Sequence, residues 1–328
     1  MQKFISDILP YMRGVPMPDP DYLNTCLGQS GWKDLDLDAS TVALIANGFE
    51  QAGLLGAPSS EPVDDPKGLK RLLKKIYRDR GVDFRAYAKT SLARRINRRM
   101  AVKQLDNYSA YSALLDRQPD EYGPLFDDLT VTVTRFFRNK TAFAALEKEV
   151  RTLMRYRKER MIRIWSVGCA TGQEPYSIAM CMDRLFSGFP DWEFRVLATD
   201  IDTKALEIAE RGLYDPVELK GMAPDRQAAY FSRDGDQLRI NDTIRSRVVF
   251  EPHNIVSDPL FERQDIIVCR NVLIYFNLSL QMRVTRHFYN ALKSRGYVLL
   301  GRYEMLLKEA RRQFSCIDFD ARLYRKKQ

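Results

Sequence analysis

The residues best suited to chemistry start in the stretch W-S-V-G-C-A-T-G-Q-E at residues 165–174, directly after the apolar residues M-I-R-I. Gly168 and Gly172 predict a tight turn from a strand into a helix, where a doubly wound sheet holds its ligand, although an unliganded turn would look similar. A second strand-like stretch ends in L-A-T-D-I-D and places Asp200 where an acid can accept hydrogen bonds from a ribose diol. Together these features indicate an adenosine-containing cofactor.

The charge at the start of the following helix discriminates between cofactors. A dinucleotide lays its pyrophosphate on a helix N-terminus, but here the helix begins with Gln173-Glu174-Pro175. A carboxylate at this position repels phosphate, whereas it can pair with the amino group of a methionine-type cofactor. This argument favours S-adenosylmethionine over a nicotinamide dinucleotide.

Histidine and cysteine usage argues against metal chemistry and against a catalytic triad. The two histidines, His253 and His287, cannot form a multi-histidine cage, and neither lies in a Ser-His-Asp or H-E-x-x-H arrangement. The five cysteines are odd in number and widely spaced, as expected of reduced thiols. We therefore expect no metal site. The lack of an 18-residue apolar run or a secretory signal predicts a cytoplasmic protein without membrane insertion.

The elements that position these residues follow from periodicity. After Arg160, strand-like and helix-like segments alternate, which predicts a parallel sheet covered by helices on both faces. Between about 214 and 250 the alternation breaks, and the turn Asp234-Gly235-Asp236 between two β-like runs predicts an antiparallel hairpin. From residue 69 to residue 138, apolar residues recur at three- and four-residue spacing and predict a helical domain.

The net charge of +9 is unevenly distributed. Residues 1–66 carry ten acids and three bases, and residues 67–110 carry fourteen bases and three acids, giving net charges of −7 and +11. We expect residues 1–64 to form an acidic helical extension, with a capped helical pattern at 38–56. The basic segment should face an acidic partner. It contains Arg95, Arg98 and Arg99 at helical spacing, although a solvated helix face would show the same pattern.

Six stretches, taken together, resemble the CheR family of chemotaxis receptor methyltransferases. In chain order they are DDLTVTVTRFFRN, IRIWSVGCATGQEPYSIAM, LATDID, ERGLYDPVELKGM, VVFEPHNI and DIIVCRNVLIYF. The resemblance covers roughly residues 68–328. It implies an α/β fold with a Rossmann-like class I methyltransferase sheet and a small antiparallel β-subdomain at 146–328, preceded by an all-α N-terminal domain at 65–145.

The resemblance also implies an activity, a cofactor and a set of cofactor-binding residues. Family members transfer a methyl group from S-adenosylmethionine to glutamate side chains on chemoreceptor cytoplasmic helices, giving glutamyl methyl esters and S-adenosylhomocysteine. Glu174 would bind the amino-acid end of the cofactor, Asp200 its ribose, and Asn254 and Ile255 would lie beside the adenine. The complete implied set is Thr132, Thr134, Arg138, Gly168, Glu174, Asp200, Asn254, Ile255, Arg270 and Asn271.

Arg138 and Tyr275 are the catalytic residues that the resemblance implies. A glutamate carboxylate has a pKa of about 4.3 and is already a nucleophile at neutral pH, so no general base is required. This chemistry explains how the enzyme could work without a catalytic histidine. Our hypothesis is that Arg138 anchors a carboxylate and that the Tyr275 hydroxyl orients the attacking oxygen.

The expected partner is the cytoplasmic domain of a chemoreceptor, docked electrostatically on Arg95, Arg98 and Arg99. The short predicted hairpin favours an enzyme that does not need a tether peptide at the receptor C-terminus, and we expect no nucleic-acid partner. Two alternatives stay open: an RNA methyltransferase that uses the basic segment to bind phosphates, and a catalytically silent cofactor-sensing scaffold. Thr132, where the family often has asparagine, and Arg302-Tyr303, where it often has His-Ser, depart from the family pattern.

Overall fold

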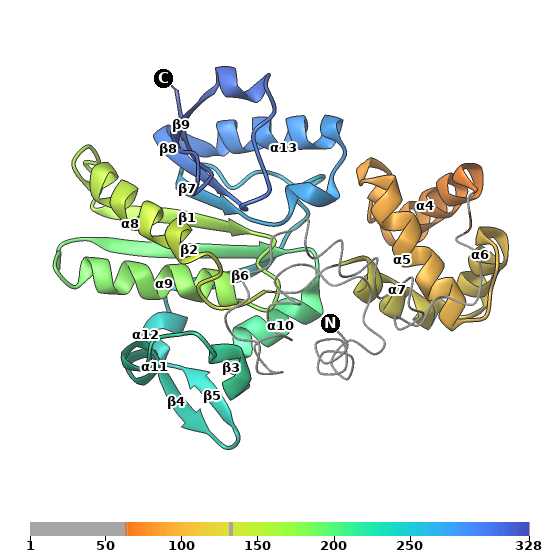
Figure 1. Ribbon diagram of the computed structural model, residues 1–328, viewed down its shortest axis with the longest axis horizontal. Coiled ribbons are helices and arrows are strands. Elements are labelled where there is room, and N and C mark those ends of the chain that lie inside the picture. Colours follow the sequence, from red (N-terminus) through yellow and green to blue (C-terminus); the bar gives the residue numbers. More distant parts are fainter. Residues whose placement is uncertain (1–62, 64, 131–133, 328) are drawn as a thin grey trace, which may run out of the picture.

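The computed structural model describes residues 63, 65–130 and 134–327 (Figure 1). The predicted extension at 1–64 lies outside the described residues, apart from Val63, as does Thr132. The described chain forms a helical domain followed by a larger α/β domain. No helix in the described ranges is long and apolar enough to cross a membrane.

The helical domain is built from short amphipathic helices around its own core. Its elements are α4 (Pro66–Arg80), η1 (Phe84–Ala86), α5 (Lys89–Val102), α6 (Tyr108–Arg117), η2 (Pro119–Glu121) and α7 (Tyr122–Leu129). Asp65 caps α4 by accepting a hydrogen bond from the Gly68 amide, and Gly81 ends it in a left-handed conformation. On α5, three apolar residues at four-residue spacing are buried, and they are Leu92, Ile96 and Met100.

The last helix of this domain is shorter than the sequence pattern predicts. The pattern extends to Arg138, but α7 ends at Leu129, and none of the residues 134–139 is helical. The chain from Thr130 to Thr134 reads T-V-T-V-T, and β-branched side chains lose rotamer freedom in a helix. The helix therefore ends before the T-R-F-F-R motif, which leaves that motif in a loop.

The α/β domain contains a seven-stranded sheet in the order β6-β2-β1-β7-β8-β10-β9. Its parallel strands are β1 (Met161–Val167), β2 (Glu193–Asp200), β6 (Val248–Pro252), β7 (Gln264–Cys269) and β8 (Leu292–Leu300). Strands β9 (Phe314–Asp318) and β10 (Leu323–Lys326) pair antiparallel at one edge, so the sheet is mixed rather than wholly parallel as predicted. The carboxyl ends of the five parallel strands meet at one edge of the sheet.

Helices cover both faces of this sheet, as predicted (Figure 1). One face packs against α8 (Lys140–Met154) and α9 (Gln173–Phe186), through buried side chains such as Leu146 and Ile178. The other face packs against α13 (Leu278–Ala291), through Val284 and Phe288. The remaining elements of this domain are α10 (Thr203–Arg211), η4 (Leu273–Tyr275) and η5 (Ala310–Arg312).

The predicted hairpin forms within a small second sheet. Strands β4 (Phe231–Asp234) and β5 (Gln237–Ile240) pair antiparallel around Gly235, and β3 (Leu213–Tyr214) adds a third strand that the sequence pattern did not show. η3 (Pro216–Leu219), α11 (Pro224–Tyr230) and α12 (Asp242–Arg245) complete this subdomain.

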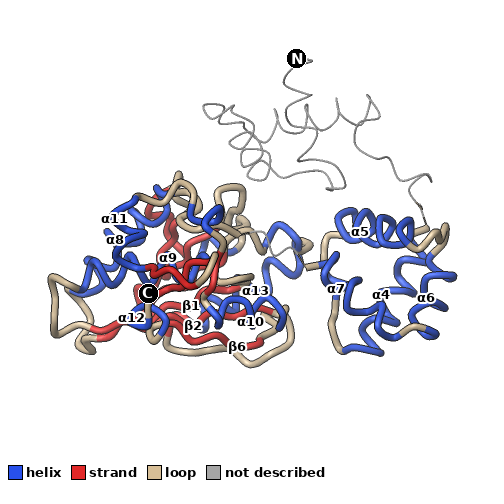
Figure 2. Tube along the Cα trace, turned by 90° about the horizontal axis from the view of Figure 1, so that it is seen from below, coloured by secondary structure: helices blue, strands red, loops and turns tan. Residues whose placement is uncertain are grey.

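The helical domain joins the α/β domain through a short backbone bridge. The Ala88 amide donates to the Tyr275 carbonyl at 2.8 Å, and the Asn277 amide donates to the Ala86 carbonyl at 3.0 Å. Between these bonds the rings of Tyr87 and Phe276 pack edge to face, with centroids 5.0 Å apart. In Figure 2 helices α4 to α7 form a separate lobe beside the α10 end of the α/β domain.

Candidate functional site

The glycine turn after β1 is tightly constrained by its neighbours. The Gly168 amide donates to the Thr199 carbonyl at 2.8 Å, which ties the turn to the end of β2. Gly168 and Gly172 have φ values of +70° and +94°, a region that favours glycine. A Cβ at Gly168 would lie 2.5 Å from the Val272 Cγ2 atom, so no larger residue fits there.

The predicted ribose acid, Asp200, lies directly beside this turn. Its Oδ2 accepts a hydrogen bond from the Ala170 amide at 2.8 Å, and its Oδ1 accepts one from the Asp202 amide at 3.0 Å. Burial raises the pKa of Asp200, while these backbone donors oppose the shift. Each carboxylate oxygen has a second lone pair with which to accept from a diol. The carboxylate is thus fixed with acceptor capacity to spare.

The predicted adenine segment is on the neighbouring strand end. The His253 amide donates to the Asp200 carbonyl at 2.9 Å, so Asn254 and Ile255 emerge beside Asp200 where β6 ends. The Asn254 side chain accepts from the Val256 amide at 3.0 Å, and Ile255 is buried against the α13 face of the sheet. The structure therefore brings the two predicted nucleoside contacts together.

Glu174 is the buried centre of the site. Its Oε1 accepts a hydrogen bond from the Ser166 hydroxyl at 2.9 Å, and its Oε2 accepts one from Arg270 Nη1 at 3.2 Å. Burial raises the pKa of Glu174 and lowers that of Arg270, and each charge opposes the shift of the other. Arg270 Nη2 also donates to the Arg138 carbonyl at 2.7 Å. The Glu174 carboxylate, the Arg270 guanidinium and the Arg138 carbonyl are thus linked, and the charge of Arg138 also acts on the pKa of Glu174 and of Arg270. A buried acid beside arginine charge is the complement of a zwitterionic amino-acid end.

The T-R-F-F-R loop reaches this point because its two phenylalanines anchor it. The Phe137 amide donates to the Ser177 hydroxyl at 2.9 Å, and its ring lies 5.4 Å from that of Phe143. The Phe136 ring packs edge to face on Tyr214, with centroids 4.9 Å apart. Phe136 and Phe137 are both buried, whereas Thr134 and Arg138 are only half-buried. The apolar pair fixes the loop and leaves Arg138 at the cleft.

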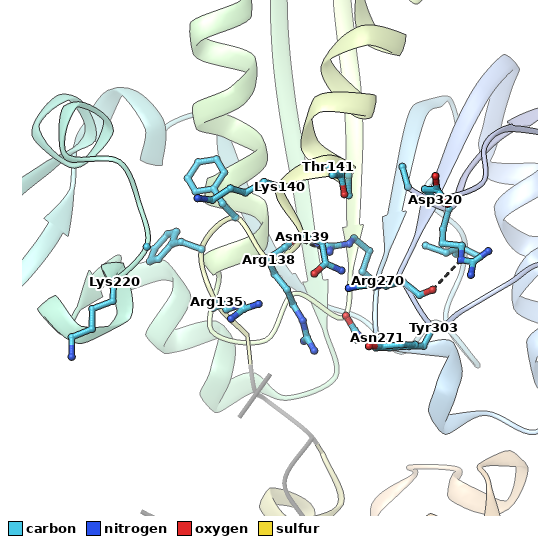
Figure 3. Close-up of a pocket in the computed structure, with 18 residues that line it drawn as sticks. Arg135, Arg138, Asn139, Lys140, Thr141, Lys220, Arg270, Asn271, Tyr303 and Asp320 are labelled. Atoms are coloured by element: carbon cyan, nitrogen blue, oxygen red, sulfur yellow. Dashed lines mark hydrogen bonds between the residues drawn. The ribbon is translucent and has the colours of Figure 1, made fainter. Parts of the chain in front are cut away.

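Beside this point opens a cavity of about 800 Å³ (Figure 3). Its lining is strongly cationic, and Asp320 is the acid among the residues that line it. The cations that line it are Arg135, Arg138, Lys140, Lys220, Arg270, Arg302 and Arg322. Arg138, Arg270 and Asn271 lie at its centre in Figure 3, and Tyr303 and Asp320 lie toward one end. The cavity is suited to hold anionic groups next to the predicted cofactor site.

A buried acid that sequence reasoning gave no role, Glu304, holds the strand ends in place. Its Oε2 accepts hydrogen bonds from the Asn271 and Gly301 amides at 2.8 and 2.7 Å. Asn271 has a φ of +62°, and the backbone bond to Glu304 maintains this conformation. Burial raises the pKa of Glu304, and these donors oppose the shift. The sequence signal that could have indicated this role is the acid of G-R-Y-E, which follows directly after β8.

Tyr275, predicted to line the reaction centre, is not among the residues that line the cavity. It ends η4 and lies at the junction with the helical domain, where its carbonyl accepts from Ala88. The Arg95 guanidinium carbon lies 5.9 Å from the centroid of its ring. The structure thus places Tyr275 between the two domains, four residues from Asn271.

The three predicted docking arginines have different surroundings. Arg95 is half-buried at the domain junction, where its Nη1 donates to the Asp128 carbonyl at 2.9 Å. Arg99 forms a two-pronged pair with the buried Glu121, with N to O distances of 2.6 and 2.8 Å. Arg98 is half-buried on α5. The helical spacing therefore groups residues that the fold uses differently.

Two family models together match most of the chain. Residues 67–130 match the all-alpha domain of CheR methyltransferase, and residues 132–323 match its S-adenosylmethionine-binding domain. This chain belongs to the CheR methyltransferase family. The protein is accordingly an S-adenosylmethionine-dependent methyltransferase, and the resemblance, the cofactor and the fold class predicted from the sequence are confirmed.

Curated relatives share about a third of the sequence. A probable chemotaxis protein methyltransferase of Rhizobium etli is 31% identical over 74% of this chain and 94% of its own. The chemotaxis protein methyltransferase of Escherichia coli is 31% identical over 72% of this chain and 83% of its own. An uncharacterized 104.1 kDa protein of Rhodobacter capsulatus is 32% identical over 75% of this chain, which spans only 26% of that longer protein.

The CheR methyltransferase site fits S-adenosylmethionine on its own geometry. The Glu174 carboxylate can accept from an amino group, Asp200 has acceptor capacity for a diol, and Arg270 Nε is buried without a hydrogen-bond partner in the described part of the chain. Within the same part, no cluster of three His, Cys, Asp or Glu side chains could hold a metal ion.

Proposed function

We propose that this protein methylates glutamate side chains on the cytoplasmic helices of chemoreceptors, in the cytoplasm, and so contributes to sensory adaptation. The observation that carries the proposal is the cationic cavity that opens where Glu174, Arg270 and Arg138 meet. A carboxylate acceptor is attracted to such a cavity, whereas a cationic acceptor such as lysine is repelled. The family membership and the relatives named as chemotaxis methyltransferases support the same acceptor.

We assign different roles in methyl transfer to the residues of the site. When bound, S-adenosylmethionine supplies an activated methyl group. Glu174, Asp200 and the Gly168 turn would hold and orient it, and Asn254 and Ile255 would lie beside its adenine. We propose that Arg138 anchors the carboxylate at the cleft and that the Tyr275 hydroxyl orients the attacking oxygen. Orientation of this kind can contribute about 7–11 kcal/mol in favourable cases, and no proton has to be removed from an ionised acceptor.

The helical domain would dock the receptor through the basic surface of α5. Of the three predicted arginines, Arg98, which is half-buried on α5, is the proposed docking residue. Arg95 faces Tyr275 and would affect the reaction centre, and Arg99 is neutralised by Glu121. Electrostatic docking predicts that the KM for receptor rises with salt, because exposed charges are screened over about 8–10 Å at physiological ionic strength. A KM that does not change with salt would refute this docking mode.

One assay tests the acceptor chemistry. The protein is incubated with methyl-tritiated S-adenosylmethionine and the cytoplasmic domain of a chemoreceptor, and the labelled product is treated with alkali. A glutamyl methyl ester releases volatile labelled methanol, and replacement of the acceptor glutamates by glutamine should abolish the label. Label that resists alkali, or that appears on RNA instead, would refute the proposal. No label on any acceptor, with S-adenosylhomocysteine bound normally, would favour a silent scaffold.

A further inference from the structure

The cavity is larger than a single acceptor side chain requires. Its volume of about 800 Å³ lies in the range of pockets that enclose whole drug-sized ligands. Its inner part, at Arg138 and Arg270, adjoins Glu174. Its outer part is formed where β8 ends and where the chain turns from β9 to β10 (Figure 3). We refer to three lining residues, Arg302, Tyr303 and Arg322, together with Phe319, which packs on Arg322, as the outer arginine lip.

The two cations of the lip lack an internal counter-ion. Within the described residues, neither Arg302 nor Arg322 forms an ion pair with a carboxylate. Arg322 Nε donates to the Arg302 carbonyl at 2.9 Å, which orients the guanidinium. Its Nη1 is buried without a hydrogen-bond partner in that same part of the chain. The lip thus presents two guanidinium groups beside the cavity that no carboxylate of the described residues neutralises.

The lip also presents aromatic surface to solvent. Tyr303 and Phe319 are 54% and 58% exposed. The Arg322 guanidinium carbon lies 4.2 Å from the Phe319 ring centroid, and that of Arg302 lies 6.0 Å from the Tyr303 centroid. Arginine and tyrosine are enriched among the residues that dominate protein interfaces, and exposed aromatic rings provide rigid contact area. This combination suits a protein segment that carries both acidic and apolar side chains better than it suits a small inorganic anion.

The start of α8 strengthens the attraction for acids. Lys140, Thr141 and Ala142 line the cavity, and no side chain caps this helix end. The positive end of a 15-residue helix therefore adds to the arginine charges. Asp320 is the one opposing charge among the lining residues, and it is exposed.

We propose that the outer arginine lip is a second subsite for a carboxylate. It binds an acidic side chain of the acceptor segment other than the one that is methylated. Tyr303 and Phe319 contact apolar atoms of that segment. This inference rests on the proposed function and makes it narrower, because a preferred acceptor helix must carry a second acid on the same face. Residues three or four positions apart lie on one face of a helix, and a seven-residue spacing returns to it.

Peptide binding tests the subsite separately from catalysis. Fluorescent helical peptides carry one acceptor glutamate and, three, four or seven residues away, either a second glutamate or a glutamine. Binding to the full chain with S-adenosylhomocysteine is followed by anisotropy. At one of these spacings the wild type should bind the two-acid peptide about tenfold more tightly, the effect of one charge-assisted hydrogen bond. The Arg302→Gln/Arg322→Gln variant should lose this preference.

A control matched to the single Arg302→Gln substitution is Arg160→Gln, which removes one positive charge just before β1, at the opposite edge of the sheet. Its side chain is 60% exposed and pairs with Asp191. This control should retain the full preference for the second acid. Thermal unfolding checks that the double variant folds; if it does not, Arg302→Gln alone, at an exposed position, should reduce the preference severalfold.

Three outcomes would overturn the inference. Wild-type protein that binds both peptides equally at every spacing has no second subsite for a carboxylate. A preference that survives in the arginine variants places the subsite elsewhere. Weaker binding of S-adenosylhomocysteine in the variants, or displacement of the peptide by an RNA oligonucleotide, would assign the lip to the cofactor or to phosphate. An incorrect proposed function would give a different result, because no alkali-labile label would appear on the receptor domain, whatever the peptide-binding experiment shows.

Discussion

Replacement of Glu121 by glutamine should destabilise the helical domain because it removes the charge that neutralises Arg99 and Lys103. The Glu121 side chain is 3% exposed, and it pairs with Arg99 and Lys103, with a shortest N to O distance to each of 2.6 and 2.8 Å. The Tyr111 hydroxyl donates to the same carboxylate at 3.2 Å. Glu121→Gln keeps the shape of the side chain but leaves Arg99 and Lys103 facing a neutral amide. The NH₂ group of that amide then points toward groups that themselves donate hydrogen bonds.

The size of the effect follows from the pKa of Glu121. Burial alone would raise it, but hydrogen bonds and charges from Arg99 and Lys103 outweigh burial and lower it from 4.5 to about 2. A difference of this size corresponds to about 3 kcal/mol of folding free energy at pH 7. Because the folded-state pKa lies below the unfolded one, this contribution is complete above about pH 5 and is lost as the pH falls toward 2.

Two optical signals separate the domains in a urea titration. In a Trp32→Phe background the remaining tryptophans, Trp165 and Trp192, lie in the α/β domain, so their fluorescence reports on that domain. Far-ultraviolet circular dichroism also detects the helices of the smaller domain. In Glu121→Gln the dichroism transition should move to lower urea while the Trp165 and Trp192 signal keeps its midpoint. The difference from wild type should fall by about half or more at pH 3.

A control for this experiment is Asp116→Asn. The Asp116 side chain is 66% exposed and pairs with Lys75, so its loss should cost less than about 1 kcal/mol. An unchanged dichroism transition in Glu121→Gln at pH 7, or a difference that is equally large at pH 3, would refute the assignment of Glu121 as the counter-ion of Arg99 and Lys103.

Four further substitutions test the site itself. Arg138→Ala and Tyr275→Phe should each lower kcat for methyl transfer at least about tenfold, with the Kd for S-adenosylhomocysteine from calorimetry changed much less; unchanged turnover in both would contradict their roles. Gly168→Ala should weaken S-adenosylhomocysteine binding by more than about tenfold, because the new Cβ would lie 2.5 Å from Val272 at a φ of +70°; normal affinity would show that the turn does not approach the cofactor. Glu304→Gln should lower the free energy of unfolding in urea by about 2–4 kcal/mol. If the glutamine oxygen accepts from the Asn271 and Gly301 amides, its NH₂ group faces the Ile274 amide, and two donors then oppose each other. A loss below about 1 kcal/mol would contradict this role.

The parts of the fold that the sequence predicts well are those controlled by local pattern. The strand from Met161 to Val167 and the strand from Glu193 to Asp200 alternate with helices, and each ends in a residue whose chemistry is visible, a glycine turn or an acid. The hairpin around Gly235 follows from its turn residues. Strand β3 has only two residues, and β9 and β10 pair antiparallel at the edge, so their placement depends on tertiary contacts that no local pattern carries.

The candidate site also has a part that local sequence pattern predicts and a part that depends on tertiary contacts. Glycine and acid positions at strand ends predict the arrangement of Gly168, Glu174 and Asp200, because parallel topology alone brings those ends together. The partnership of Glu174 with Arg270 joins residues 96 positions apart, and the cavity collects cations from the T-R-F-F-R loop, the β-subdomain and the β9–β10 turn. No periodicity links such segments, so the cavity could not be predicted from spacing.

The basic residues of α5 and the arginines of the cavity differ in where their counter-charge comes from. This difference decides what each group can bind. Arg99 has its partner within the protein, since Glu121 lies 22 residues away on the neighbouring helical turn and satisfies it in the folded state. Arg302 and Arg322 have only exposed Asp320 near them in the cavity lining. A cation that is already paired gains little from an acidic partner, because docking must first break the internal pair. Recognition of an acidic acceptor should therefore depend more on the cavity arginines than on the helix with the greater positive charge.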